Sequence, residues 1–129
     1  MITVLCANTG IDRTYEVEGF QIGAFHHPKR FRTAPGGKGI NVARVLRALG
    51  HDVLVTGFTG GASAQFIINY LRREGITCDF VNIGEESRVC INIVDSLRKS
   101  QTRVDEIGAL VTPSEVEQLR LKWPQLLQR

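Results

Sequence analysis

The sequence lacks any apolar run approaching the roughly 18 residues that a membrane-spanning helix requires. Its first residues, Met1 to Ala7, contain no basic segment, and their apolar stretch is shorter than that of a secretory signal. We therefore expect a cytoplasmic protein without a membrane partner.

Cysteine is scarce, and no Cys-x-x-Cys pair is present. The three cysteines, Cys6, Cys78 and Cys90, are an odd number, and each lies in an apolar setting typical of a strand. This pattern predicts buried free thiols in a reducing compartment and disfavours a disulfide framework or a cysteine-bound metal. The adjacent His26 and His27 would point to opposite faces of a strand, so they do not indicate a metal site either.

The sequence also has little net charge, since 16 basic and 13 acidic side chains leave a formal charge of +3. A denser basic cluster at residues 26–32 contains one aromatic residue, but neither an RNA-binding aromatic motif nor a Cys/His finger is present. We expect no nucleic-acid partner, because an anion-binding pocket explains the basic surplus equally well. With 129 residues, of which 43% are hydrophobic, the chain has the composition of one globular domain.

The most informative stretch is residues 34–61, which opens with a glycine turn at residues 35–39. Apolar residues recur next with helical spacing and predict a helix whose buried face is formed by Val42, Val45, Leu46 and Leu49. The β-branched run at residues 53–58 predicts a buried strand, and Gly60-Gly61 predicts a second turn.

A glycine turn at the start of a helix points free backbone N–H groups and the positive end of the helix dipole at one place. The sequence therefore predicts a site there for an anionic or polyhydroxylated ligand, with Lys38 and Asn41 beside it. Two better-known glycine motifs do not fit. A Walker A loop needs Ser or Thr after its lysine, where Gly39 stands, and a dinucleotide fingerprint needs a small residue in place of Val42.

The run Gly-Gly-Lys-Gly-Ile-Asn-Val-Ala-Arg at residues 36–44 is followed by a strand and by Gly-Phe-Thr-Gly-Gly at residues 57–61. This order resembles the first signature of the phosphofructokinase-B, or ribokinase-like, family of carbohydrate kinases. It is most similar to the branch with 1-phosphofructokinase and tagatose-6-phosphate kinase. The resemblance implies ATP-dependent phosphorylation of an alcohol group on a phosphorylated sugar. An ordinary helix with a glycine turn is the alternative interpretation.

Asp12 follows the predicted first strand at residues 2–7, which is apolar enough to be central in a sheet, and the turn at residues 8–10. From the residues alone, a turn-capping role is the stronger interpretation and a ligand-binding role the weaker one. The segment from Asn8 to Thr14 is, however, similar to the family's opening segment, whose matching Asp binds sugar hydroxyls. The resemblance thus assigns Asp12 to the sugar.

Arg88 stands at the start of a predicted strand, and its planar guanidinium suits phosphate because it can bind two oxygens at once. The segment at residues 86–93 is similar to the family's Thr-Arg segment, whose Arg contacts the substrate. The resemblance therefore implies a substrate site without a catalytic residue or a metal ligand, made of Asp12, Gly36, Gly37, Lys38, Asn41 and Arg88.

The rest of the pattern alternates helices and strands. A helix is predicted over residues 62–74, with Ser63 as a possible cap and an apolar face formed by Phe66, Ile67, Tyr70 and Leu71. A strand is predicted over residues 76–83, and a hairpin over residues 89–105 whose return strand is residues 102–105. A capping box at Thr112 opens a last helix, which Pro124 should kink or end. This alternation implies βαβ units and a parallel sheet with flanking helices.

The resemblance implies one ribokinase-like α/β domain over residues 1–129, together with a small β lid sheet over the sugar. The lid strands are expected at approximately residues 12–33 and 88–106. One basic residue of this lid is a further candidate for the substrate phosphate, and the sequence leaves the choice open among Lys29, Arg30 and Arg32.

The chain departs from the family at the end of the predicted lid. Where the branch has Thr-Glu, then Asn, then Gly between prolines, this chain has Thr102-Arg103, Asp105 and residues 107–109, Ile-Gly-Ala. The later Gly-Ala-Gly-Asp motif, whose Asp is the family's catalytic base, and the nucleotide site are missing. We therefore expect the substrate-side portion of a sugar-phosphate kinase that is inactive alone and does not bind the ATP and Mg²⁺ of the full-length family.

A function of another class is open as well, because the chain can be interpreted as a non-catalytic sugar-phosphate-binding or dimerising module. The sugar itself also stays open among fructose 1-phosphate, fructose 6-phosphate and tagatose 6-phosphate. In either interpretation, an open edge of the parallel sheet invites pairing with another chain. We expect a homo-oligomer formed through the lid or through that edge.

Overall fold

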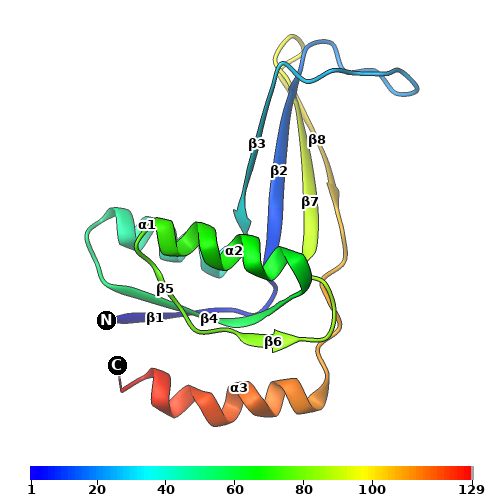
Figure 1. Cartoon of the computed structure of the whole chain (residues 1–129). Helices are drawn as coiled ribbons and strands as arrows, with labels where there is room; N and C mark the ends of the chain where they lie inside the picture. Colours follow the sequence, from blue (N-terminus) through cyan, green and yellow to red (C-terminus); the bar gives the residue numbers. More distant parts are fainter. Residues whose placement is uncertain (129) are drawn as a thin grey trace.

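The computed structural model describes residues 1–128 as two sheets set at an angle, the first with helices on both faces (Figure 1). The core sheet consists of four parallel strands, β1 (Ile2–Cys6), β4 (Val53–Gly60), β5 (Thr77–Cys78) and β6 (Val81–Ile83). β4 pairs with β1 on one side and with β5 and β6 on the other. Every residue of β4 is buried, and the parallel pairing confirms the predicted α/β class.

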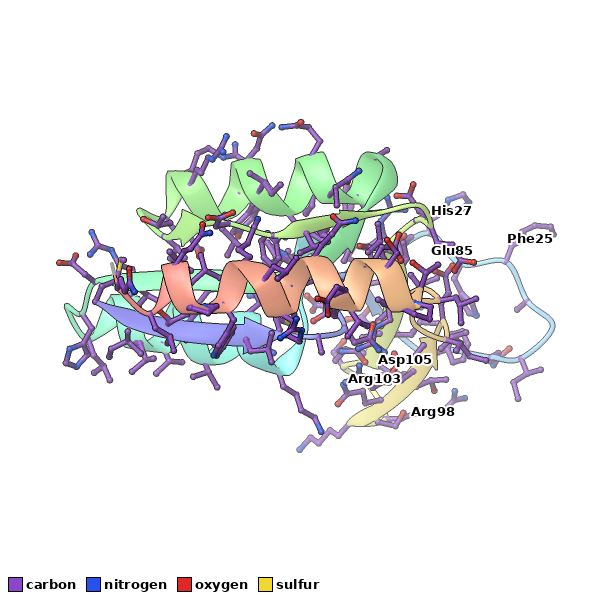
Figure 2. The ribbon with its side chains drawn as sticks, turned by 90° about the horizontal axis from the view of Figure 1, so that it is seen from below. Phe25, His27, Glu85, Arg98, Arg103 and Asp105 are labelled. Carbon is purple, nitrogen blue, oxygen red and sulfur yellow. The ribbon has the colours of Figure 1, made fainter. Side chains whose placement is uncertain are left out.

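The helices α1 (Lys38–Ala48) and α2 (Gly61–Arg73) lie on one face of the core sheet, and α3 (Pro113–Leu126) lies on the other (Figures 1 and 2). The predicted apolar face of α2 is confirmed, because Ile67 and Leu71 are fully buried in the core. Burial of each contributes about 1.5–3 kcal/mol. Among residues 1–128, no helix has both the length and the apolar character needed to cross a membrane.

The face predicted for α1 is wrong. Three of its four expected core residues are at least half exposed, namely Val42 at 52%, Val45 at 59% and Leu49 at 69%. Ile40 and Ala43 are buried instead. The helix packs close to β1, since a Cβ on Gly39 would lie 2.4 Å from the Leu5 carbonyl oxygen. α1 therefore presents an uncovered apolar surface to the outside.

α3 begins at the predicted capping box, which is confirmed. The Thr112 hydroxyl accepts a hydrogen bond from the Glu115 amide at 3.3 Å, and the Glu115 carboxylate accepts one from the Thr112 amide at 2.7 Å. The helix does not end at Pro124 but continues to Leu126, which is 1% exposed. Burial of this leucine offsets the one hydrogen bond that Pro124 cannot donate.

A second sheet extends away from the core, and we call it the projecting sheet. Its strands are β2 (Gly10–Val17), β3 (Arg30–Gly36), β7 (Arg88–Asp95) and β8 (Ser100–Asp105), in the order β3-β2-β7-β8 (Figure 1). β7 and β8 form the predicted antiparallel hairpin. β2 starts at Gly10, so Asp12 lies within a strand and its interpretation as a turn-capping residue is wrong.

The segment at residues 76–83 is not one strand as predicted, because it is interrupted at Asp79-Phe80. The Asp79 carbonyl accepts a hydrogen bond from the Thr56 hydroxyl at 2.7 Å, and its carboxylate accepts one from Lys122 of α3 at 2.6 Å.

The predicted cap of α2, Ser63, is also wrong. The Glu86 carboxylate takes that place and accepts hydrogen bonds from the amides of Ala62 and Ser63 at 3.0 and 2.6 Å.

β1 was expected to be a central strand from its apolar sequence, but it lies at the edge of the core sheet. Within residues 1–128 it pairs only with β4, and Ile2 and Leu5 are 38% and 45% exposed. Next to the exposed side chains of α1, this edge leaves apolar surface and unpaired backbone groups in contact with solvent.

The Asp95 carboxylate binds the backbone of the two segments that follow β2 and β7 at the outer end of the projecting sheet. It accepts hydrogen bonds from four backbone amides, those of Gly19, Phe20, Leu97 and Arg98. Burial alone would raise the pKa of Asp95, but these donors lower it below its ordinary value. A lowered pKa stabilises the fold above the pKa of an unfolded aspartate, about 3.9, and this stabilisation is lost as the pH falls.

We therefore expect Asp95→Asn to lower the melting temperature at neutral pH and to flatten its pH dependence between about pH 5 and pH 2. Thermal melts of the two proteins, followed by circular dichroism across this range, measure the effect. Asp52→Asn is the matched control, because the side chain of Asp52 is 85% exposed and makes one surface ion pair. Parallel curves for the wild type and Asp95→Asn would contradict the expectation.

Candidate functional site

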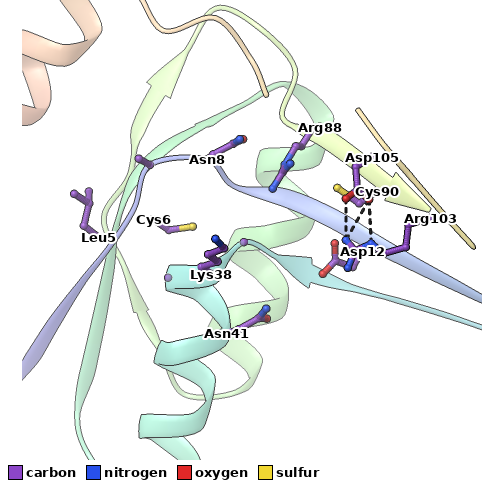
Figure 3. A pocket seen from close by; sticks show the side chains of 13 residues that line it. Leu5, Cys6, Asn8, Asp12, Lys38, Asn41, Arg88, Cys90, Arg103 and Asp105 are labelled. Atoms are coloured by element: carbon purple, nitrogen blue, oxygen red, sulfur yellow. Dashed lines mark hydrogen bonds and ion pairs between the residues drawn. The ribbon is translucent and has the colours of Figure 1, made fainter. Parts of the chain in front are cut away.

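A cavity of about 820 Å³ opens where the core sheet meets the projecting sheet (Figure 3). Its walls come from the end of β1, the start of α1, β2, and the β7–β8 hairpin. Five of the six predicted site residues line it, namely Asp12, Gly37, Lys38, Asn41 and Arg88. The fold thus brings together side chains from three separate stretches of the sequence.

Asp12 lies on β2, and the sixth predicted residue, Gly36, lies beside it on β3. A Cβ on Gly36 would be 2.5 Å from the Asp12 carboxylate, so only glycine leaves room for that carboxylate in its present position. Among residues 1–128, no hydrogen bond or ion pair is found for Asp12. The carboxylate is therefore positioned by packing and keeps its acceptor capacity for a ligand.

The glycine turn places the start of α1 at the cavity wall. Gly37 is the N-cap residue, with φ 115°, and within residues 1–128 no side-chain hydrogen bond caps the helix. The amides of the first turn therefore stay available to the cavity. Lys38 and Asn41 extend from this turn toward the cavity in Figure 3. The glycines at 37 and 39 also have a packing role, because a Cβ on Gly37 would lie 2.7 Å from the Cys6 sulfur.

Arg88 is positioned by a buried hydroxyl network just before it. The Ser87 hydroxyl accepts a hydrogen bond from the Gly60 amide at 3.1 Å and lies 3.1 Å from the hydroxyl of Thr9. Thr9 in turn donates to the Phe58 carbonyl oxygen at 2.8 Å. The network joins the starts of β2 and β7 to the end of β4. The Nε atom of Arg88 is itself buried without a hydrogen-bond partner in the described part of the chain.

Sequence reasoning did not assign Arg103 and Asp105 to the site, although both line the cavity. Arg103 donates two hydrogen bonds to the Asp105 carboxylate at 3.1 Å each, drawn as dashed lines in Figure 3. The sequence did indicate that the two residues lie together. Residues 102–105 were predicted to form a strand, and residues two apart on a strand lie on the same face. What the sequence did not provide was the pairing of β7 with β2, which brings the hairpin and its exposed face beside Asp12.

The structure does not bring the basic residues of β3 and its preceding loop to the cavity. Lys29 forms an ion pair with Glu18 at 2.7 Å, and neither Arg30 nor Arg32 borders the cavity.

The three cysteines are free, as expected, although Cys78 is only partly buried. Burial raises the pKa of the Cys90 thiol in the cavity wall, so this group stays uncharged and is a poor nucleophile.

Within residues 1–128, no group of three or more His, Cys, Asp or Glu side chains is placed to hold a metal ion. The cavity instead combines three cations, a helix N-terminus, and the Asp12 carboxylate, for which no hydrogen bond or ion pair is found within residues 1–128. Such a set can bind an anionic group at one end of a ligand and hydroxyl groups at the other.

The chain is similar to known carbohydrate kinases. The model of the pfkB family carbohydrate kinases matches residues 3–125. A tagatose-6-phosphate kinase from Staphylococcus epidermidis is 33% identical over 120 residues, which cover 93% of this chain and 38% of that protein.

Two solved structures are similar as well. A possible 1-phosphofructokinase from Thermotoga maritima is 30% identical with a TM-score of 0.91, over 98% of this chain and 41% of its own. Phosphofructokinase-2 from Escherichia coli, solved in complex with fructose-6-phosphate, is 23% identical with a TM-score of 0.87, over 99% of this chain and 41% of its own. The chain thus spans about two fifths of the length of these proteins.

Proposed function

The chain belongs to the pfkB family of carbohydrate kinases, and on this basis we propose that it is the substrate-binding portion of a kinase acting on phosphorylated ketohexoses. The observation that carries the proposal is the meeting of Asp12, Lys38, Asn41 and Arg88 at one cavity. The names of the relatives, a tagatose-6-phosphate kinase and a possible 1-phosphofructokinase, support this substrate class.

Each residue has a proposed role that follows from its chemistry. Asp12 accepts hydrogen bonds from sugar hydroxyls, and Asn41 binds a further hydroxyl. Gly36 leaves the space that the Asp12 carboxylate occupies, and the amides following Gly37 approach the sugar from the helix start. Lys38 and Arg88 neutralise the phosphate, Arg88 through the buried Nε atom that lacks a partner among residues 1–128.

Phosphoryl transfer also needs a nucleotide, a metal ion and a base that orients the attacking hydroxyl. ATP with Mg²⁺ is the donor we propose for the complete catalytic unit. We assign no residue of this chain to either, because the chain spans only about two fifths of the length of the kinases it resembles. We therefore propose that the 129-residue chain binds the sugar phosphate without phosphorylating it.

The test is a calorimetric titration of the purified chain with fructose 1-phosphate, fructose 6-phosphate and tagatose 6-phosphate, with unphosphorylated fructose as the control. We expect saturable binding of at least one ketohexose phosphate and weaker binding of fructose. Absence of saturable binding by a chain that melts cooperatively would contradict the binding role. ATP-dependent phosphorylation of these sugars by the pure chain would contradict the proposed inactivity.

We further propose that the chain self-associates, through the open edge at β1 or through the projecting sheet. The support is apolar surface at both places. Leu5 is 45% exposed on β1, and the loop after β2 carries Ile22 at 97% exposure and Phe25 fully exposed at its far end (Figure 2). Edges and patches of this kind favour association with another chain.

Light scattering of the purified chain should accordingly give a mass above the 14.3 kDa of one chain. Leu5→Lys places a charge on the β1 edge, whereas Phe25→Ser removes the apolar tip of the loop. The variant that restores a single-chain mass identifies the interface. A monomeric wild type with a sharp cooperative melt would contradict self-association.

A further inference from the structure

We propose that Arg103 is a specificity-determining residue that binds the phosphoryl group of the substrate, and that Asp105 is the counter-ion which the phosphoryl group displaces. The inference rests on the proposed function of the cavity. It assigns β8 a role in recognition, beyond the residues that the sequence resemblance singles out.

The ion pair between the two residues is arranged for exchange with a ligand. Arg103 reaches one Asp105 oxygen through Nε at 3.4 Å and both oxygens through Nη2 at 3.1 Å. Its Nη1 atom makes no hydrogen bond within residues 1–128. The two side chains are 56% and 39% exposed, so a phosphate in the cavity can reach the guanidinium. A guanidinium binds phosphate in the same two-oxygen geometry that it uses here for the carboxylate.

The register of the projecting sheet aligns the pair with the proposed sugar site. Asp105, Cys90 and Asp12 occupy matching positions on β8, β7 and β2. Arg103 and Asn92 occupy the corresponding positions two residues farther from the core sheet. Since side chains alternate between the faces of a sheet, both rows lie on the face that borders the cavity. Arg103 therefore lies just outward of Asp12, on the side away from α1 (Figure 3).

Two polar atoms on this face of β7 have no partner in the described part of the chain. They are the Nε atom of Arg88 and the Oδ1 atom of Asn92, and both are buried. Buried polar atoms are usually hydrogen-bonded, and exceptions indicate a missing ligand or a functional rearrangement. The two atoms stand on either side of Cys90, where a group held between Arg88 and Arg103 would lie.

The charges around the cavity also fit a phosphoryl group. Lys38, Arg88 and Arg103 oppose two carboxylates, those of Asp12 and Asp105, and leave one positive charge in excess. A phosphate ester at neutral pH carries a charge of about −1.5 to −2. The excess rises to two positive charges if the Asp105 carboxylate is removed, so Asp105 moderates the affinity for phosphate.

Stabilisation of the fold is a weak explanation for this ion pair. Both residues are on the edge strand β8, where every residue is exposed. Ion pairs in such positions contribute little to stability. A function in binding therefore explains the placement of Arg103 and Asp105 better than a function in folding.

The test is a titration of the full chain and its variants with two probes, fructose 6-phosphate and inorganic phosphate. We expect Arg103→Gln to weaken the binding of both probes by about tenfold or more. We expect Asp105→Asn to strengthen the binding of both by about threefold. A general loss of structure would weaken binding in both variants, so the opposite signs separate recognition from folding.

The matched control is Arg120→Gln on α3, because Arg120 makes a similar bidentate ion pair with Glu117 outside the cavity. Equal effects of Arg120→Gln and Arg103→Gln would overturn the proposal, as would unchanged binding in Arg103→Gln or weaker binding in Asp105→Asn. So would a wild-type chain that binds neither probe.

The role of Asp12 in sugar binding is tested separately in the same titration. Asp12→Asn should weaken the binding of fructose 6-phosphate but not that of inorganic phosphate. If Asp12→Asn loses the sugar phosphate while Arg103→Gln binds both probes normally, the proposal for Arg103 fails and the proposed function stands. If Arg103→Gln weakens both probes while Asp12→Asn has no effect, the assignment of the sugar site fails and the phosphate-binding role of Arg103 stands.

Discussion

Asp12→Asn is expected to weaken the binding of ketohexose phosphates by about tenfold to a hundredfold, with little change in the melting temperature. The carboxylate accepts hydrogen bonds from hydroxyl groups at both oxygens, whereas an amide presents a donor at one of them. Hydrogen bonds to a charged acceptor contribute about 1.5–3 kcal/mol each, which sets the expected range. Stability should be nearly unaffected, because Asp12 has no hydrogen bond or ion pair to lose among residues 1–128.

The measurement is a calorimetric titration of both proteins, together with a thermal melt of each. Asp52→Asn again serves as the control, since it removes an equal charge at a site outside the cavity. Binding by Asp12→Asn that matches the wild type would remove Asp12 from the site. A large drop in its melting temperature would show instead that the carboxylate is needed for folding.

Gly57→Ala is expected to destabilise the fold by more than about 4 kcal/mol, which is a large part of the stability of a domain of this size. Gly57 lies on the central strand β4 with φ 132°, a backbone conformation that residues with a Cβ rarely adopt. A Cβ there would lie 1.9 Å from the carbonyl oxygen of Cys6 on the neighbouring strand. The pairing of β1 with β4 would have to open at this point.

Urea unfolding followed by circular dichroism measures the effect, with Gly50→Ala as the control. Gly50 also has a positive φ, 90°, but a Cβ added there would meet nothing within 4 Å. Gly50→Ala should therefore cost only the conformational strain, about 1–2 kcal/mol. Equal destabilisation by the two substitutions would contradict a steric clash at Gly57.

The sequence predicted well the features that depend on local patterns. The apolar face of α2, the β7–β8 hairpin and the capping box of α3 follow from periodicity and from the chemistry of helix ends, and all three are confirmed. The family assignment is also confirmed, because it rests on a long ordered run of residues from Gly36 to Gly61. Such features are encoded by neighbouring residues, so no tertiary contact is needed to infer them.

Features that depend on tertiary packing were missed. Periodicity identified Val42, Val45 and Leu49 as apolar but could not reveal that the close packing of Gly39 on β1 turns them outward. The pair Arg103 and Asp105 belongs to the cavity only because β7 of the predicted hairpin pairs with β2. Pairing between strands that are distant in the sequence is a long-range property, and a single sequence does not specify it.

The most direct test of a sugar-phosphate site at this cavity is an amide NMR titration of the ¹⁵N-labelled chain with fructose 6-phosphate. We expect saturable shifts in the amides around the cavity, above all those of Asp12, Gly37, Asn41 and Arg88. Amides of α3 on the opposite face of the core sheet should stay unchanged. Shifts that do not saturate, or that concentrate on α3 while the cavity amides stay fixed, would contradict a sugar-phosphate site at this cavity.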